Sequence, residues 1–254
     1  MRQDRKKNLI SIITVVKNGE STLENCIQSV LSQNYSNIEY IIVNGYSTDR
    51  TNEILNKYKD KISLIINKKD GGIWDAMNIG LEKATGDIVG FLNADDYYYD
   101  GALKIVNNYF SSQQIDFLFG AVDKYKLMHG YKPWKSKWSF GFYTSHSVGF
   151  FIKTEKHKEV GNYNSKYLSA DLDLFYKIIH NFKMQGIASK KTEIFGKFAK
   201  GGFSSKVNYI DHLIDLNQIR IANNQSPVFV YFIFLIKILK KPFKFLKGIQ
   251  MKYF

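Results

Sequence analysis

The sequence predicts an α/β fold with a mostly parallel sheet, because short Ile- and Val-rich runs alternate with segments of helical periodicity. The apolar runs cover residues 9–16, 38–43, 62–66 and 88–92. Strands that alternate with helices form βαβ units, in which each helix crosses over the sheet and successive strands run parallel. Residues 9–115 are therefore expected to form a Rossmann-like nucleotide-binding half.

Three helices are expected between these strands. The first is expected to begin with a capping box formed by Ser21 and Glu24. The second covers about residues 51–58. The third begins near Gly72 and ends at Gly86, where a glycine can adopt the left-handed conformation that closes a helix.

Beyond residue 100 the pattern loosens into aromatic, mixed sequence. Strands are expected at 117–122 and 148–152, and a helix at 170–180. Such a half typically shapes a second substrate site. We expect one domain, residues 1–205, in which the second half covers 116–205.

Length and composition limit the remaining possibilities. The 254 residues, 44% of them apolar, suffice for one sizeable core and a tail. A net charge of +13 indicates an anionic partner, which nucleic acid, an acidic membrane or a diphosphate would each satisfy. The only cysteine, Cys26, excludes a disulfide framework and a cysteine metal site. Residues 1–8 lack the apolar core of a secretion signal, so a cytoplasmic location is expected.

The tail, residues 206–254, changes character from residue 226 onward. Residues 228–236 carry no charge, and lysines then alternate with apolar residues without any acidic residue. The uncharged run is shorter than the roughly 20 residues that span a bilayer. Spacings of three and four suggest a helix that lies in the membrane interface. The alternative is a helix packed on the domain with a solvated lysine face. The lysines that would share this face are Lys237, Lys240, Lys244 and Lys247.

Two adjacent carboxylates, Asp95 and Asp96, directly follow the apolar run 88–92. The carboxyl ends of parallel strands are where open α/β sheets bind ligands. Mg²⁺ and Mn²⁺ prefer oxygen ligands and bridge carboxylates to the phosphates of a nucleotide. An aspartate pair is also common in turns, so the neighbouring motifs must decide between the two interpretations.

Four segments, in this order and spacing, resemble glycosyltransferase family 2. They are 10–19 (ISIITVVKNG), 39–51 (EYIIVNGYSTDRT), 70–80 (DGGIWDAMNIG) and 91–96 (FLNADD). The similarity covers about residues 9–205 and is closest to the branch that builds bacterial surface polysaccharides such as O-antigen and colanic acid. It implies a GT-A fold and an inverting transfer of sugar from a nucleoside-diphosphate donor to an acceptor held by the second half.

The resemblance also implies roles at the donor site. Asp96 would bind Mg²⁺ or Mn²⁺, and Asp95 would contact the ribose or the donor sugar. Asn93 stands where many relatives have the first aspartate of the metal motif, and it can still exchange hydrogen bonds with the donor. The first strand, which contains Thr14, and the segment ending at Asp49 would hold the base.

Further donor contacts are expected before and within the third helix. Asn44 stands where relatives commonly have an aspartate that grips the base, and its amide oxygen favours a UDP or dTDP donor over GDP. Alternatively, it only shapes the turn before Tyr46. Asp70, Asp75 and Asn78 would line the donor pocket. The alternative for Asp75 and Asn78 is to cap the first turn of the helix.

The catalytic base is expected at Asp171, in a segment (SADLD) that resembles the acidic motif of the family. Direct displacement needs a carboxylate that accepts the proton of the acceptor hydroxyl while a metal stabilises the departing diphosphate. A plain helix-start role is the alternative for Asp171. Asp173 would support Asp171 in its catalytic role. His146 would contact the acceptor or the diphosphate, or serve as a scaffold, and Lys200 is available to phosphate.

The implied partners are a nucleoside-diphosphate sugar, a polyprenyl-diphosphate-linked saccharide acceptor and the anionic surface of the inner membrane. The protein would be peripheral on the cytoplasmic face. A nucleic-acid-binding protein is an alternative, because lysines flank Trp134 and Trp138. The carboxylates Asp95, Asp96 and Asp171 would repel a phosphate backbone without a metal, so no nucleic acid is expected.

A second alternative is a relative that binds the donor but has lost catalysis. Asn44 and Asn93 both replace acids that are common in the family. The transferred sugar, the acceptor sugar and the linkage are not encoded in these motifs.

Overall fold

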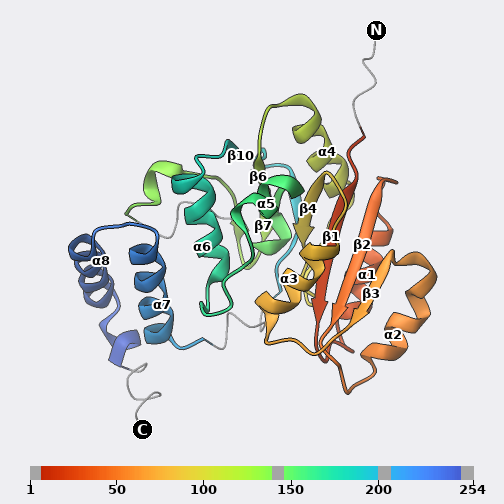
Figure 1. Ribbon diagram of the computed structural model, residues 1–254, viewed down its shortest axis with the longest axis horizontal. Coiled ribbons are helices and arrows are strands. Elements are labelled where there is room, and N and C mark those ends of the chain that lie inside the picture. Colours follow the sequence, from red (N-terminus) through yellow and green to blue (C-terminus); the bar gives the residue numbers. More distant parts are fainter. Residues whose placement is uncertain (1–6, 139–145, 200–206, 247–254) are drawn as a thin grey trace.

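The structure is a computed structural model of the chain that describes residues 7–138, 146–199 and 207–246. Its centre is a seven-stranded sheet (Figure 1), which contains β1 (Ile10–Val16), β2 (Ile38–Asn44), β3 (Leu64–Asn67), β4 (Ile88–Phe91), β6 (Phe117–Phe119), β9 (Phe150–Lys153) and β10 (Gly186–Ala188). The strand order is β10-β6-β9-β4-β1-β2-β3. Among these strands β9 runs antiparallel to its neighbours β4 and β6, and the other pairings are parallel.

Helices cover both faces of this sheet. One face carries α1 (Leu23–Leu31), α2 (Thr51–Tyr58) and α4 (Ala102–Ser112), and the other carries α3 (Ile73–Lys83), α5 (Thr154–Val160) and α6 (Ala170–Tyr176). Beyond α6 lie α7 (Tyr209–Ala222) and α8 (Pro227–Lys240), as Figure 1 shows. The expected α/β fold with a mostly parallel sheet is confirmed.

The pattern of β1 explains why the sheet is buried on both sides. Ile10 and Ile12 pack into the core beneath α1, whereas Ile13 and Val15 pack into the core beneath α3. A strand covered on both faces reads as a continuous apolar run, which is how β1, β2 and β4 appear in the sequence.

Two local expectations for the helices were wrong. Helix α1 has Thr22 as its N-cap without a side-chain capping bond, and Glu24 instead accepts a hydrogen bond from Lys57 at 2.5 Å. Helix α3 ends at Lys83, so Gly86 does not close it. A Cβ on Gly86 would lie 2.7 Å from the backbone oxygen of Leu9, so this glycine permits a close approach of two chain segments.

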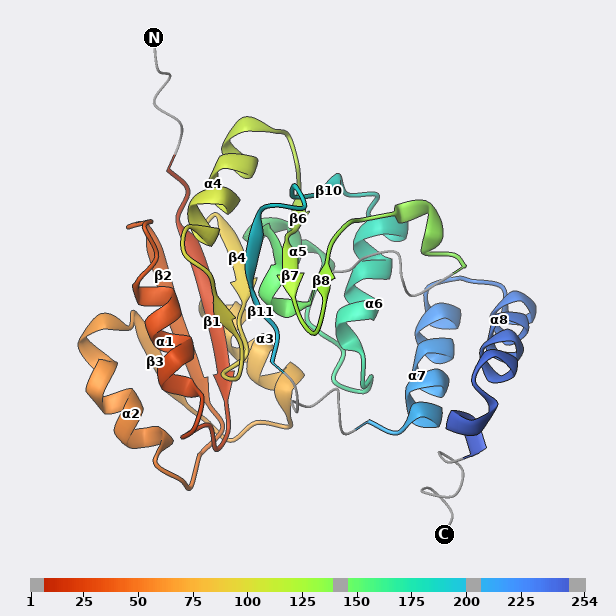
Figure 2. The same cartoon turned by 180° about the vertical axis from the view of Figure 1, so that it is seen from behind.

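A smaller sheet has the order β5-β11-β7-β8 and packs on the same face as α1 and α4 (Figure 2). The expected strand 117–122 divides at Gly120, so that β6 joins the large sheet and the next strand joins the small one. A Cβ at Gly120 would lie 2.2 Å from the Phe195 ring, which explains the glycine at this crossing. The strands are β5 (Tyr97–Tyr98), β7 (Ala121–Asp123), β8 (Leu127–Met128) and β11 (Ile194–Lys197).

The expected helix 170–180 is regular only to Tyr176 and continues as a π-helical turn over Lys177–Asn181. The expected strand 148–152 begins later, as β9, after a 3₁₀ turn over Ser147–Gly149. Both elements exist where the pattern placed them, and their ends differ by a few residues.

The two C-terminal helices differ in how they meet the domain. Leu216 and Ile219 of α7 belong to the same core cluster as the apolar residues of α6. Helix α8 buries Val230 and Ile233 and exposes most of its other large side chains. The boundary at residue 205 stays a prediction. No helix in the described ranges is long and apolar enough to cross a membrane.

Candidate active site

A cavity of about 1080 Å³ opens at the carboxyl ends of β1, β3 and β4. Asp70 and Asp95 line it from the sheet side, and Asp171 lines it from the start of α6. His146, which precedes β9, lines it as well. With Asn93, five of the expected site residues, from segments far apart in sequence, therefore share one space, whereas Asp96 lies beneath its lining.

The carboxylate pair sits in a tight turn directly after β4. The N–H of Asp96 donates to the carbonyl of Asn93 at 2.9 Å, and this turn directs Asp95 into the cavity. Asp96 is 1% exposed, and its Oδ1 accepts the N–H of Ala199 at 2.8 Å. Burial raises the pKa of both carboxyls, and the neighbouring charge of Asp95 raises the pKa of Asp96 further.

Two buried oxygens in this turn have no hydrogen-bond partner within the described residues: Oδ2 of Asp96 and Oδ1 of Asn93. Buried acceptors without a partner are costly, and a cation would satisfy both. The described part of the chain contains no group of three or more His, Cys, Asp or Glu side chains that could hold a metal. The two unpartnered oxygens are of the type that Mg²⁺ and Mn²⁺ prefer, and such an ion would need diphosphate and water oxygens as its other ligands.

A lysine and a histidine lie at the same end of the cavity as these carboxylates, and the charge of Lys124 acts on Asp96. Lys124, from the turn between β7 and β8, lines the cavity with its Nζ 3.3 Å from Nε2 of His146. Phe198 supports both side chains, stacking on the His146 ring at 4.1 Å and lying 4.4 Å below the ammonium group. Burial and the charge of Lys124 lower the pKa of His146 to about 4, so the imidazole is neutral at neutral pH.

Sequence reasoning did not single out Lys124. A lysine in a hairpin turn is usually solvated, and only the switch of the chain into the small sheet at Gly120 turns this one towards the cavity. No local pattern in the sequence signals that placement.

Asp171 occupies the first turn of α6, as the sequence predicts. Its Oδ1 accepts the N–H of Leu172 at 3.0 Å. Burial raises the pKa of Asp171 to about 6, and the charge of Asp215 acts in the same direction. A carboxyl with this pKa is ionised at neutral pH and basic enough to take a proton.

Other expected donor residues lie away from the cavity lining. Asn44 is 1% exposed and donates to the side-chain oxygens of Asn52 and Asn67, both at 2.8 Å, while its own oxygen accepts from Ser47. These contacts occupy the whole amide and favour the turn interpretation. Thr14 is buried within the core beneath α1, where its hydroxyl lies 3.2 Å from another hydroxyl, that of Tyr40.

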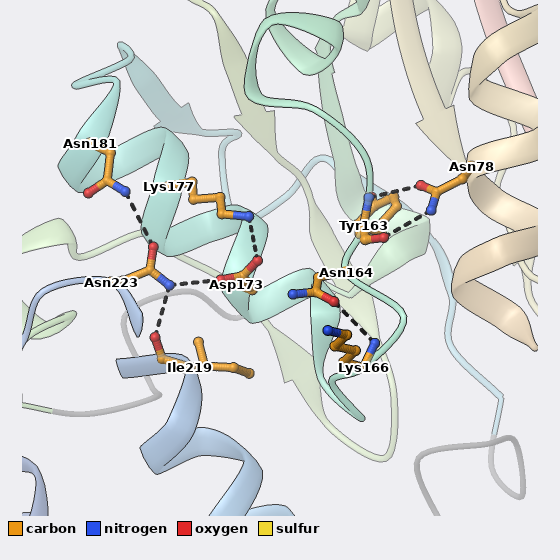
Figure 3. Close-up of polar contacts among 9 residues, drawn as sticks. All are labelled: Asn78, Tyr163, Asn164, Lys166, Asp173, Lys177, Asn181, Ile219 and Asn223. Atoms are coloured by element: carbon orange, nitrogen blue, oxygen red, sulfur yellow. Dashed lines mark hydrogen bonds and ion pairs between the residues drawn. The ribbon is translucent and has the colours of Figure 1, made fainter. Parts of the chain in front are cut away.

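Around α3, too, one of the expected donor residues lines the cavity and the others do not. Asp70 lines the cavity, whereas Asp75 accepts the N–H of Gly71 at 2.9 Å, a bond to the turn before the N-cap Gly72 and not to the helix end itself. Asn78 exchanges two hydrogen bonds with the backbone of Tyr163, at 2.9 and 2.8 Å, and so joins α3 to the second half (Figure 3). Lys200 lies outside the described residues.

The far end of the cavity is formed by the C-terminal region. Tyr209 and His212 of α7 line it, together with Lys244 after α8. The sequence pattern placed Lys244 on the lysine face of a membrane-interface helix, or alternatively on a solvated face, and neither residue of α7 belongs to a motif.

Comparisons with known proteins agree with this geometry. The sequence model of Glycosyl transferase family 2 matches residues 11–176. An uncharacterised glycosyltransferase of Rickettsia typhi is 31% identical over 204 residues, which cover 79% of this chain and 57% of that protein. The Escherichia coli protein WfaP, a UDP-Glc:α-D-GlcNAc-diphosphoundecaprenol β-1,3-glucosyltransferase, is 36% identical over 112 residues, 44% of this chain and 45% of that one.

Two solved structures share the fold at 17% identity. Staphylococcus aureus TarS 1-349 in complex with UDP-GlcNAc superposes with a TM-score of 0.67 over 89% of this chain and 70% of that chain. The mannosyltransferase PcManGT from Pyrobaculum calidifontis, in complex with GDP-Man and Mn²⁺, superposes with a TM-score of 0.68 over 96% of this chain and 74% of that chain. The GT-A fold is thereby confirmed, and, with the family match extending over most of the described sheet, the chain belongs to glycosyltransferase family 2.

Proposed function

We propose that the protein is a metal-dependent, inverting glycosyltransferase that adds a sugar to a lipid-linked saccharide during synthesis of a bacterial surface polysaccharide. The observation that carries the proposal is a single cavity that joins the Asp95–Asp96 turn to Asp171. The chain spans about half the length of the curated relatives it matches, 57% and 45% of the two described above.

At the donor end, Asp96 and Asn93 would hold Mg²⁺ or Mn²⁺ through their unpartnered oxygens. The metal supplies positive charge to the departing diphosphate. Lys124 and the neutral His146 lie at the same end and would add an ammonium and an imidazole contact to the phosphates. Asp95 would bind the ribose or the donor sugar.

At the acceptor end, Asp171 would accept the proton of the attacking hydroxyl. The bond between the anomeric carbon and the diphosphate breaks as the acceptor oxygen bonds to that carbon from the opposite side. The name of the E. coli relative gives it a diphosphoundecaprenol-linked acceptor, which supports an acceptor of the same class here. His212 and Lys244 would then lie nearest to the lipid-linked diphosphate.

The exposed side of α8 supports contact with a membrane. Apart from Lys240, its exposed long side chains are apolar or aromatic, and the Phe229 ring packs on Trp138 at 4.7 Å, so an exposed tryptophan extends the same surface. Lys237 is partly buried, which argues against the alternative of a fully solvated lysine, and burial lowers its pKa to about 7. The surface of α8 that would face the membrane is therefore largely apolar with lysines near it, an arrangement suited to insertion at the interface. The large apolar side chains exposed on α8 are Val228, Tyr231, Phe232, Leu235 and Leu239.

The transfer activity is tested by screening UDP-, dTDP- and GDP-sugars for metal-dependent hydrolysis and for transfer to a diphosphate-linked acceptor. A UDP- or dTDP-sugar is expected to be turned over, and EDTA should abolish the reaction. Donor binding without hydrolysis or transfer under any condition would support the inactive-relative alternative.

Membrane contact is tested with vesicles of anionic and of neutral lipid. The double variant Phe232→Ser, Leu235→Ser keeps the buried Val230 and Ile233 and should lower co-sedimentation with anionic vesicles. A chain shortened after Gln225 should bind least. Equal binding by all forms would leave α8 as a packed helix, the alternative stated above.

A further inference from the structure

Helix α7 holds the segment that leads to Asp171. Asp215 of α7 is 5% exposed, and its two carboxylate oxygens accept consecutive backbone N–H groups. Oδ1 accepts from Leu168 at 2.9 Å and Oδ2 accepts from Ser169 at 2.9 Å. These are the last two residues before α6, so the carboxylate fixes the orientation of the chain as it enters the helix.

A second contact between the same helices lies on the other side of Asp171. Nδ2 of Asn223 donates to Oδ1 of Asp173 at 2.7 Å, and Nζ of Lys177 lies 2.7 Å from the other oxygen (Figure 3). Asp173 is 3% exposed and does not line the cavity. This contact joins α7 to the body of α6, whereas Asp215 acts at its first turn.

The chain before α6, residues 161–169, forms no helix or strand. Its contacts with other elements include two hydrogen bonds between Asn78 and the backbone of Tyr163, seven residues before α6. Closer to α6, besides Asp215, they include a bond from Trp74 Nε1 to the carbonyl of Leu168 at 3.3 Å and an approach of His212 to the Ser169 hydroxyl at 3.3 Å. A carboxylate that accepts two adjacent N–H groups is the strongest of these constraints.

We infer that Asp215 is a positioning residue for the catalytic base, holding residues 168–169 so that the Asp171 carboxylate faces the acceptor. The inference rests on the proposed role of Asp171 as the base. Asparagine cannot replace Asp215, because its one oxygen serves a single N–H and its amide group opposes the other. General-base catalysis depends on geometry, and a displacement of about 1 Å can cost roughly 100-fold in rate.

The experiment compares Asp215→Asn with Asn223→Ala, a matched control that removes the other α6–α7 contact. Asp215→Asn should lower kcat by roughly tenfold to 100-fold while the KM for the donor sugar stays within about twofold. Asn223→Ala should lower thermal stability at least as much and leave kcat nearly unchanged. Equal losses of kcat in the two variants, following their losses of stability, would overturn the inference.

A double variant separates this inference from the proposed function. If Asp215 acts through Asp171, Asp215→Asn should have no further effect on kcat in the Asp171→Asn background. Independent, multiplicative losses would contradict positioning. An unchanged kcat in Asp171→Asn alone would instead refute the proposed base, whatever Asp215 does.

Discussion

The two ends of the cavity are held by different kinds of structure. Asp95 and Asp96 follow β4, which is hydrogen-bonded on both sides, to β1 and to β9. Asp171 follows a segment without regular structure, whose last two residues, Leu168 and Ser169, donate to a carboxylate on α7. The donor carboxylates therefore follow a paired strand, whereas the acceptor carboxylate follows an irregular segment, and the two should respond differently to substitution.

The largest effect is expected at the donor end. Asp96→Asn keeps an oxygen for the N–H of Ala199 but removes the charge that would bind the metal. Turnover should fall by roughly 1000-fold or more, and binding of Mn²⁺, followed by its electron paramagnetic resonance signal, should be lost. Full activity of wild-type protein in EDTA would remove the metal from the mechanism.

At the acceptor end, the ionisation of Asp171 should determine how kcat/KM depends on pH. Asp171 must be ionised to accept a proton, and its pKa is raised to about 6, so kcat/KM should fall about tenfold per unit as pH drops below 6. His146, with a pKa near 4, stays neutral in this range and adds no limb there. Asp171→Asn should lower kcat by roughly 100-fold with donor affinity retained, and the acid limb should disappear. A limb that persists in this variant would point to another group.

A smaller effect is expected for Lys124, which the sequence did not reveal. Lys124→Met should weaken binding of the nucleoside-diphosphate donor by about tenfold, the usual size of one hydrogen bond to a charged group. Lys126→Met, an exposed lysine in the same hairpin, is the control. Titration calorimetry with UDP and metal measures both, and similar affinities for the two variants would show that Lys124 does not reach the phosphates.

The smallest effect on activity is expected at Asn44. Asn44→Asp loses the two hydrogen bonds donated to Asn52 and Asn67 and sets a carboxylate against two amide oxygens. The free energy of unfolding in urea should fall by about 1–3 kcal/mol, with little change in donor binding. Unchanged stability together with tighter donor binding would restore the base-recognition role.

The sequence predicted the features that have a local pattern and missed those that depend on distant partners. The strands β1, β2 and β4 and the helices between them were found because buried parallel strands are continuous apolar runs. The positions of Asp95 and Asp171 relative to their elements also followed from pattern and resemblance. The break at Gly120 and the role of Asp215 were not found, since both depend on partners distant in sequence and neither residue carries a local signature.

The antiparallel strand β9 has a consequence for the order in which the sheet is assembled during synthesis. Strand β9 pairs with β4 on one side and with β6 on the other. Until Phe150–Lys153 leave the ribosome, β4 is an open sheet edge and β6 has no connection to the nucleotide-binding strands. An open apolar edge attracts other chains. The nascent protein should therefore depend most on chaperones in the interval between completion of β4 and arrival of β9.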